Sequence, residues 1–257
     1  MHNVAFKMFV WYNSIISKKK DGNKMIGIIG AMDIEVNGII EEMTNTRTET
    51  ISGTNYTAGD LGGTGCVIAK CGIGKVNAAM TAQTMILRYK PDRIINTGIG
   101  GSTSLHTHIG WVVIAKNVVQ HDMDTTIIGD QPGELFLPDE KIIYLPCDEK
   151  MVSDLEKACD SAGESNHITG TIATGDQFIG GNERRLSLNE RFGALACEME
   201  GGSIGQVCRI NHIPFAVLRS ISDSMSSEDD GVEYSTFSRE AASRSIRIIN
   251  EYIKAYT

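Results

Sequence analysis

The sequence of 257 residues has no unbroken apolar segment of membrane length, so the residue pattern predicts no transmembrane helix. It also has no excess of basic residues, because 24 Lys and Arg face 32 Asp and Glu, for a formal net charge of -8. Proteins that bind nucleic acid need a basic surface, so this balance argues against a nucleic-acid partner. A small, neutral or cationic ligand fits the composition better.

The sequence also lacks the common metal-binding motifs, and we expect no nucleophilic Ser or Cys. Its six cysteines form no C-x-x-C pair and lie mostly in apolar runs such as GCVIAKCG, so we expect buried, reduced thiols of a cytoplasmic protein. The histidines show no H-x-x-E-H or H-E-x-x-H spacing, and HDMD at 121–124 is too short a cluster to predict a metal site. We expect no nucleophile elbow, although GGSIG at 201–205 has the G-x-S-x-G spacing. We therefore expect neither a metal nor a cofactor.

The first 24 residues have part of the composition of a secretory signal but not its order. Their lysine run follows the apolar stretch instead of preceding it, and no small-residue cleavage motif appears. We interpret residues 1–24 as an appended extension or a miscalled start. Since no repeat or low-complexity linker divides the rest, residues 25–257 are predicted to form a single domain.

Short apolar runs alternate with longer amphipathic segments from Met25 onward. The near-continuous apolarity of the short runs predicts strands covered on both faces, at IGIIG, CVIAKCG, RIINTG, WVVIA, TIATG, ALACE and FAVLRSIS. Helices are predicted in DIEVNGIIEEM, in KVNAAMTAQTMILRY up to Pro91, in GGSIGQVCRIN and over about 234–252. Turn-forming residues predict a surface loop over 125–141. The pattern indicates an α/β fold with a sheet flanked by helices.

The glycine-rich stretches fit no nucleotide-binding fingerprint. CGIGKV has the Gly-Lys of a P-loop, but Val76 replaces the Ser or Thr that would hold magnesium, and Ala69 replaces the first glycine. TGIGGS and GIIGA lack the G-x-G-x-x-G spacing of a dinucleotide site. Two interpretations stay open for these glycines: tight strand-to-helix turns, or backbone that lines a small-molecule pocket at the carboxyl ends of the strands.

Acidic residues follow several of the predicted strands. Glu35 lies just past IGIIG, Glu198 and Glu200 end the ALAC run, and Asp223 follows FAVLRSIS. Each one alone is also explained as a solvated first-turn or capping residue. Together they would place several carboxylates in one crevice without a histidine or cysteine in a matching position. This set suggests acid/base work on a neutral bond, with glycosidic cleavage as a candidate.

Six ordered motifs resemble those of the bacterial 5'-methylthioadenosine/S-adenosylhomocysteine nucleosidases of the purine and uridine phosphorylase superfamily: IGIIGAMDIEV, CGIGKV, IINTG, TGDQFI, CEMEG and RSISD. The resemblance covers essentially all of residues 25–257. It implies a three-layer α/β fold whose central, mixed and twisted β-sheet is flanked by helices. The implied activity is hydrolysis of the N-glycosidic bond of 5'-thioadenosines, releasing adenine and a 5-thioribose. The family also implies a homodimer.

The resemblance assigns roles to individual residues. It implies that Glu35 is the general base that activates water, that Asp223 is the acid that delivers a proton toward adenine N7, and that Glu200 holds the ribose hydroxyls. The other implied contacts are Arg219, which supports the acidic cluster, Met199 against the sugar, Phe178 stacked on the purine, the backbone of Ile179 beside Ser222 at the purine edge, and Met32, Ile73 and Tyr234 around the 5'-thio group.

Two stretches depart from the family pattern. TGIGGS stands where family sequences commonly read T-G-S-A-G-G, so Ile99 replaces a serine near the ribose. The loop after HDMD lacks the aromatic residues expected near Ile128 and Asp130, where the 5'-substituent rests. The alternative substrates S-adenosylhomocysteine, 5'-deoxyadenosine and aminodeoxyfutalosine therefore stay open beside methylthioadenosine.

Two further alternatives stay in view. A phosphorylase would have to hold a phosphate dianion where Glu35 would repel it, and no G-D-x-x-R loop is present, so hydrolysis is preferred over phosphorolysis. A catalytically silent nucleoside-binding module on the same fold is the alternative from another class. The presence of Glu35, Glu200 and Asp223 counts against such a module.

The CEME segment contains two glutamates, Glu198 and Glu200, for which we expect different roles. Alternation along an extended strand would place Glu198 and Glu200 on the same side and Met199 on the other. The family pattern instead has both Met199 and Glu200 at the ribose, so we expect the chain to leave regular strand geometry here, as Gly201 and Gly202 permit. Glu200 is the predicted ribose ligand, while the role of Glu198 stays open.

Overall fold

The computed structural model describes residues 24–223 and 230–256. Except for Lys24, the predicted extension 1–24 lies outside the described residues, so its interpretation stays a prediction. Within the described ranges, no helix combines the length and the apolarity needed to cross a bilayer.

The strands build one mixed sheet in the order β11-β10-β6-β12-β5-β1-β4-β3-β2, with β9 paired to β6. Parallel pairs join β1 to β4 and β5, and β5 to β12. The strands are β1 (Met25–Gly30), β2 (Thr44–Ile51), β3 (Thr54–Leu61), β4 (Thr64–Lys70), β5 (Arg93–Ser102), β6 (Val112–Gln120), β9 (Tyr144–Pro146), β10 (His167–Thr174), β11 (Ala194–Glu198) and β12 (Phe215–Asp223).

One extra pairing brings two strand ends together beside the acidic residues. β11 runs antiparallel to the end of β5, where Ala196 lies opposite Ser102 and Cys197 lies opposite Gly101. β5, β12, β6, β10 and β11 therefore form a closed ring of paired strands. The carboxyl ends of β5, β11 and β12 meet at the same edge of the sheet as a result.

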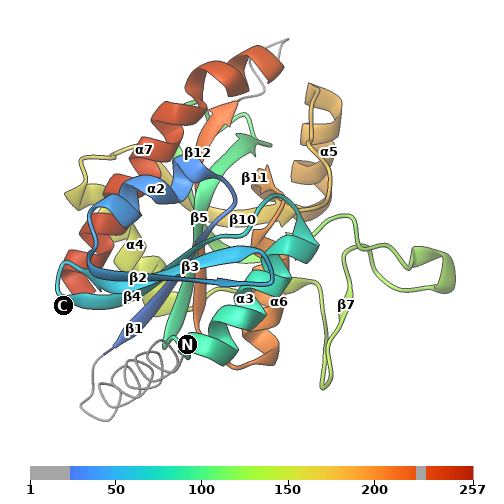
Figure 1. Ribbon diagram of the computed structural model, residues 1–257. Coiled ribbons are helices and arrows are strands. Elements are labelled where there is room, and N and C mark those ends of the chain that lie inside the picture. Colours follow the sequence, from blue (N-terminus) through green and yellow to red (C-terminus); the bar gives the residue numbers. More distant parts are fainter. Residues whose placement is uncertain (1–23, 224–229, 257) are drawn as a thin grey trace.

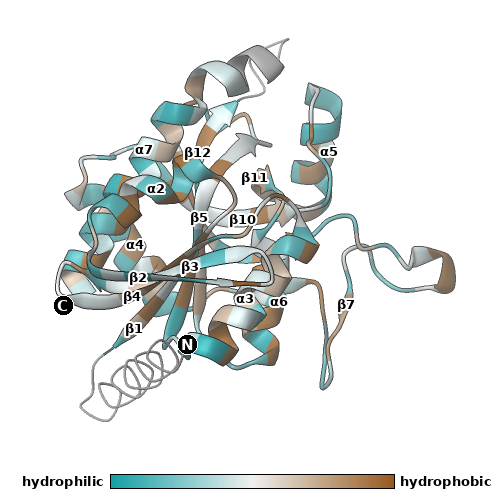
Figure 2. Cartoon of the chain, in the orientation of Figure 1, coloured by the Kyte–Doolittle hydropathy of each residue, from teal (hydrophilic) through white to brown (hydrophobic). Residues whose placement is uncertain are grey.

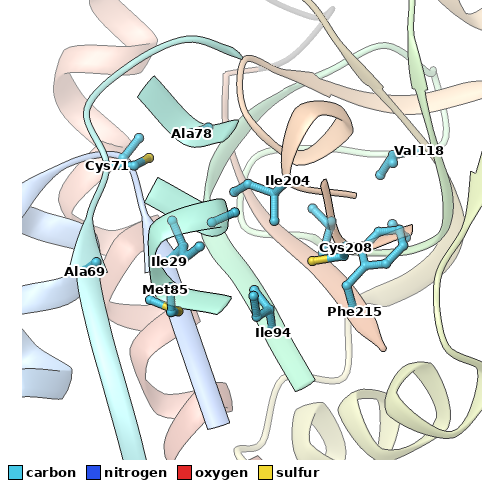
Figure 3. Close-up of a cluster of buried hydrophobic side chains, with 14 of the residues drawn as sticks. Ile29, Ala69, Cys71, Ala78, Met85, Ile94, Val118, Ile204, Cys208 and Phe215 are labelled. Carbon is cyan, nitrogen blue, oxygen red and sulfur yellow. The ribbon is translucent and has the colours of Figure 1, made fainter. Parts of the chain in front are cut away.

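Helices cover both faces of the sheet, which confirms the three-layer prediction (Figure 1). α2 (Asp33–Glu41), α4 (Glu149–Ser161) and α7 (Asp230–Tyr256) enclose one buried core against the strands. α3 (Lys75–Tyr89) and α6 (Gly201–Ile210) enclose the other, which contains Ile29, Met85, Ile204 and Phe215 (Figure 3). α3 ends at Tyr89, and its C-cap Lys90 adopts a left-handed conformation directly before Pro91, where the helix was predicted to stop.

The six cysteines are all buried free thiols, as predicted. Burial raises the pKa of the Cys66, Cys147, Cys159 and Cys197 thiols to about 12. Protonated thiols of this kind are packed side chains and not nucleophiles.

The predicted surface loop over 125–141 is mostly irregular. It holds only the short turn η1 (Thr126–Ile128) and the strand β7 (Leu135–Phe136), which pairs with β8 (Lys141–Ile142). The loop that carries β7 stands away from the body of the molecule (Figure 1). Its turn η1 is apolar, with Ile127 97% exposed and Ile128 76% exposed.

The sequence pattern missed several elements. The hairpin of β2 and β3 has no apolar run in its first strand, TNTRTETI, which is an edge strand with mostly exposed or half-buried residues. α5 (Asn182–Phe192) was also missed, because most of its side chains are polar, as its teal colour in Figure 2 shows.

Candidate active site

A single pocket of about 610 Å³, including its open mouth, collects the acids at the carboxyl ends of the strands. Ten of the eleven residues predicted for the site line it; the eleventh, Arg219, is buried directly behind them. The lining residues are Ala31, Met32, Glu35, Ile73, Ile99, Gly100, Gly101, Gln177, Phe178, Ile179, Cys197, Glu198, Met199, Glu200, Ser222, Asp223 and Tyr234.

Glu35 lies in the first turn of α2 and turns back toward the pocket. Its Oε2 accepts hydrogen bonds from the backbone N–H groups of Ala31 (2.6 Å) and Met32 (2.9 Å), and its Oε1 accepts one from Ile99 (3.0 Å). Burial nevertheless raises the pKa of Glu35 above its ordinary value, against Arg219 and these N–H donors. A buried, rigidly held carboxylate with a raised pKa is suited to accept a proton.

Glu200 is held by the glycine-rich turn before α3. Gly74 adopts a φ of 96°, which favours glycine, and its N–H donates to Glu200 Oε1 at 2.9 Å. Burial and then the adjacent Glu198 raise the pKa of Glu200 to about 7, opposed by Arg219 and the Gly74 N–H. The CGIGKV stretch is therefore both a strand-to-helix turn and part of the pocket wall.

TGIGGS requires a correction of the turn interpretation, because it lies inside β5. A Cβ at Gly98 would lie 2.6 Å from Glu35 Oε1, and one at Gly101 would lie 2.8 Å from Asp223 Oδ2. These glycines leave room for two carboxylates, so the pocket interpretation holds here and the turn interpretation is wrong.

Glu198 ends β11 and acts as an anchor for the start of α6. Its Oε2 accepts the N–H groups of Glu200 (3.0 Å) and Gly201 (2.7 Å), while Oε1 accepts from the Thr174 hydroxyl. These are among the first backbone donors of the helix, which have no partner within it. The regular strand ends at Glu198 and the helix begins at Gly201, which confirms the predicted departure.

Arg219 is buried behind Glu198 and Glu200. Its Nη2 donates to Glu198 and to Asn96 Oδ1 (2.5 Å) and lies 3.7 Å from Glu200 Oε2. Burial opposes its charge, but the surrounding carboxylates raise its pKa further above the ordinary value. Arg219 thus compensates part of the negative charge of this cluster, in line with the supporting position expected for it.

Asp223 ends β12 and is buried at the opposite side of the pocket. Its Oδ1 accepts a hydrogen bond from Ser222 Oγ at 2.7 Å, and its Oδ2 contacts Nη2 of Arg185. Arg185 was missed in the sequence, although one signal pointed to it. It shares a stripe of α5 with the buried residues Leu188 and Phe192, at the spacing of a helix face that packs inward.

The apolar side of the pocket is formed by Met32, Phe178, Tyr234 and Ile99. The rings of Phe178 and Tyr234 meet edge to face with centroids 5.6 Å apart, and the Tyr234 hydroxyl lies 3.4 Å from Met32 Sδ. Ile99 packs against the same cluster with its side chain. This wall can receive an aromatic base and an apolar substituent, while the acids face it from the other walls.

Known proteins are similar to this chain over most of its length. The family model described as the phosphorylase superfamily matches residues 25–254. The chain is 39% identical over 230 residues to the 5'-methylthioadenosine/S-adenosylhomocysteine nucleosidase of Shewanella piezotolerans strain WP3, over 89% of this chain and 98% of that protein.

Solved structures are similar over nearly the whole chain. S-adenosylhomocysteine nucleosidase from Streptococcus pyogenes, in complex with 5-methylthiotubericidin, matches with a TM-score of 0.85 and 31% identity, over 92% of this chain and 98% of that one. Futalosine hydrolase of Helicobacter pylori strain 26695 matches with a TM-score of 0.84 and 29% identity, over 90% and 98% of the two chains.

Proposed function

The chain belongs to the phosphorylase superfamily, within its 5'-methylthioadenosine/S-adenosylhomocysteine nucleosidases, and we propose that it hydrolyses the N-glycosidic bond of 5'-thioadenosines. The products are adenine and a 5-thioribose. The observation that carries this function is the charge of the pocket wall. Glu35, Glu198, Glu200 and Asp223 line it, and no lysine or arginine does so among the described residues. A phosphate dianion has no cation to bind there, so this wall favours water over phosphate as the nucleophile.

The proposed reaction divides the work between the two sides of the pocket. Glu35 takes a proton from water, which attacks the anomeric carbon of the ribose. The bond from that carbon to N9 breaks, its electron pair passes to the adenine, and Asp223 delivers a proton to N7. Glu200 holds the ribose hydroxyls, and the surrounding anionic oxygens stabilise the oxocarbenium-like transition state. Glu35 then loses its proton to solvent, and Asp223 takes up a proton from solvent.

The binding roles follow the walls of the pocket. Phe178 stacks on the purine while the backbone of Ile179, beside Ser222, meets its edge. Met199 lies against the sugar, where Arg219 supports the acids from behind. Met32, Ile73 and Tyr234 receive the 5'-thio group, because this wall is apolar.

A second substrate class is favoured by the similarity to the Helicobacter pylori futalosine hydrolase. The pocket has an open mouth next to Ile73, which is 56% exposed. A larger 5'-substituent can extend there past the adenosine. Aminodeoxyfutalosine is therefore the alternative substrate to set against methylthioadenosine.

A homodimer is proposed from an apolar stripe that begins at the pocket. Ile73, Val76, Met80 and Leu87 recur at helix spacing on and just before α3, and all four are exposed. A second copy packed on this stripe would cover the pocket mouth. The six free cysteines support a reducing compartment, and we place the enzyme in the cytoplasm.

Release of adenine from methylthioadenosine tests the function. The wild-type protein should produce adenine and methylthioribose in buffer without phosphate, and added phosphate should not increase the rate. Asp223→Asn and Glu35→Gln should each lose about a thousandfold in kcat, because each removes one proton-transfer group. Ribose-1-phosphate as a product would replace hydrolysis with phosphorolysis, and intact nucleoside after long incubation would favour the silent binding module.

A further inference from the structure

Arg185 is the buried charged group closest to the proposed acid, and it has no role in the reaction described so far. Its side chain is fully buried at the first turn of α5. Nη2 contacts Asp223 Oδ2, Nε donates to the Ile179 carbonyl at 3.2 Å, and Nη1 donates to the Ser102 carbonyl at 3.3 Å. One guanidinium therefore joins the acid, the loop at the purine edge and the end of β5.

We infer that Arg185 is a positioning residue that selects which oxygen of Asp223 gives its proton to the leaving base. This inference rests on the proposed function. A guanidinium has only donors, so the oxygen that it contacts must act as an acceptor. Oδ2 is held in this way. Oδ1 is then the oxygen that carries the proton, because its partner, the Ser222 hydroxyl, can rotate to accept as well as to donate.

The same contact acts on the charge that develops during the reaction. When the bond to N9 breaks and the proton passes to N7, a full negative charge remains on Asp223. A guanidinium already fixed at Oδ2 stabilises that charge without reorganising. Gly101 preserves the contact, because a Cβ there would lie 2.8 Å from Asp223 Oδ2 and 3.5 Å from Arg185 Nη2.

The hydrogen bond from Arg185 to the Ile179 carbonyl fixes the distance between Asp223 and the loop of Phe178 and Ile179, which is proposed to bind the adenine. Phe178 and Ile179 line the pocket, and the Ile179 carbonyl is tied to the guanidinium that holds Asp223. The adenine ring bound by this loop is thereby presented to Oδ1 in one orientation. Loss of Arg185 should reduce the rate of bond cleavage more than substrate binding.

The test compares Arg185→Met and Arg185→Lys with Arg191→Met, a control on the exposed side of the same helix. With methylthioadenosine, Arg185→Met should lower kcat by about 100-fold and change KM much less. Arg185→Lys should recover part of the loss, and Arg191→Met should match wild type. An unchanged kcat in Arg185→Met, with active wild type, would overturn the inference and leave the proposed function intact.

A double-mutant cycle separates action through Asp223 from a general structural effect. In the Asp223→Asn background, Arg185→Met should cost less than about threefold further, since the proton to be positioned is already gone. Losses that multiply would mean that Arg185 only supports the fold. Circular dichroism checks each variant, and if Arg185→Met does not fold, the cycle is run with Arg185→Lys. Wild type that releases no adenine would overturn the proposed function and this inference together.

Discussion

Two buried arginines lie at opposite sides of the pocket and interact with different numbers of acidic side chains. Arg219 contacts Glu198, lies 3.7 Å from Glu200 and acts electrostatically on Glu35. Arg185 contacts Asp223 directly. Around Arg219, which is the proposed ribose side, three carboxylates therefore share one guanidinium. Asp223, on the proposed purine side, has a guanidinium against one of its two oxygens.

Burial is the main cause that raises the pKa of Glu35 and that raises the pKa of Glu200 to about 7, and the charge of Arg219 offsets this only in part. These are the side chains proposed to take a proton from water and to accept the ribose hydroxyls. In the proposed reaction, the carboxylates around Arg219 would stabilise a cationic transition state, and Arg185 would hold the proton donor Asp223 in place.

The largest expected effect separates the two glutamates of CEME. Glu200→Gln should lower kcat/KM by about a thousandfold with little loss of stability, because Glu200 is the proposed ribose ligand and its carboxylate accepts from the Gly74 N–H. Glu198→Gln should lower Tm more and turnover less, because Glu198 holds Arg219, Thr174 and the start of α6. Steady-state kinetics and calorimetry on both variants check this.

Equal or reversed losses of turnover would mean that Glu198 holds the ribose. The comparison between the two sides of the pocket would then need a different ribose ligand beside Arg219.

A matched pair of glycines tests both sides at once. Gly98→Ala would press a methyl group on Glu35, and Gly101→Ala would press one on Asp223. Each should reduce kcat by about 100-fold, because the added methyl group would displace the carboxylate and disturb the geometry of proton transfer. Gly53→Ala is the control: it has open space but a φ of 81°, so it should lower Tm and leave kcat unchanged. Wild-type kcat in either β5 variant would show that the acid beside it tolerates movement.

The site acids could be predicted from the sequence because each follows an apolar strand, and the carboxyl ends of these strands meet at one edge. The strand-ending Glu198 and Asp223 and the first-turn Glu35 are examples of such positions. Arg185 could not be found in the same way. It lies in a polar helix far along the chain from Asp223, and only the closed fold brings the two together.

The fold was predictable to the same extent and for the same reason. Apolar runs in the sequence indicate buried strands, and all seven predicted runs lie in strands of the sheet. The edge strand β2 has its side chains mostly in solvent, and the short β9 has only three residues. Neither leaves a periodic apolar signal. The sequence also left the role of Glu198 open. That role depends on where the strand ends, and the alternation of side chains along a strand does not show this position.

The raised pKa of Glu200 predicts that activity depends on pH. As the proposed ribose ligand, Glu200 would accept hydroxyls best when ionised, and burial raises its pKa to about 7. Below that value kcat/KM should fall by about tenfold per pH unit, since the protonated form accumulates. Glu200→Gln should flatten this limb in a pH–rate profile. A limb of the same position and depth in that variant would assign it to another acid, with Glu35 the first to examine.

Stability should change in the opposite direction with pH. The folded-state pKa of Glu200 exceeds its ordinary value of 4.5, so its contribution is complete below about 4.5 and is lost as the pH rises through about 7. The Tm of Glu200→Gln relative to wild type should therefore be higher at pH 8 than at pH 5. Calorimetry at the two pH values checks this, and a constant difference would contradict the raised pKa.

The smallest expected effect concerns the apolar wall that both sides share. Ile99 donates its backbone N–H to Glu35 and packs its side chain with Met32 and Tyr234. Ile99→Ser keeps the N–H but removes apolar contact, so preference for methylthioadenosine over adenosine should fall by about fivefold in kcat/KM. The ratio for the two substrates isolates this effect, because adenosine lacks the methylthio group. An unchanged ratio would place the 5'-substituent on Ile73 and away from Ile99, and a parallel loss for both substrates would mean that the side chain acts through the position of Glu35.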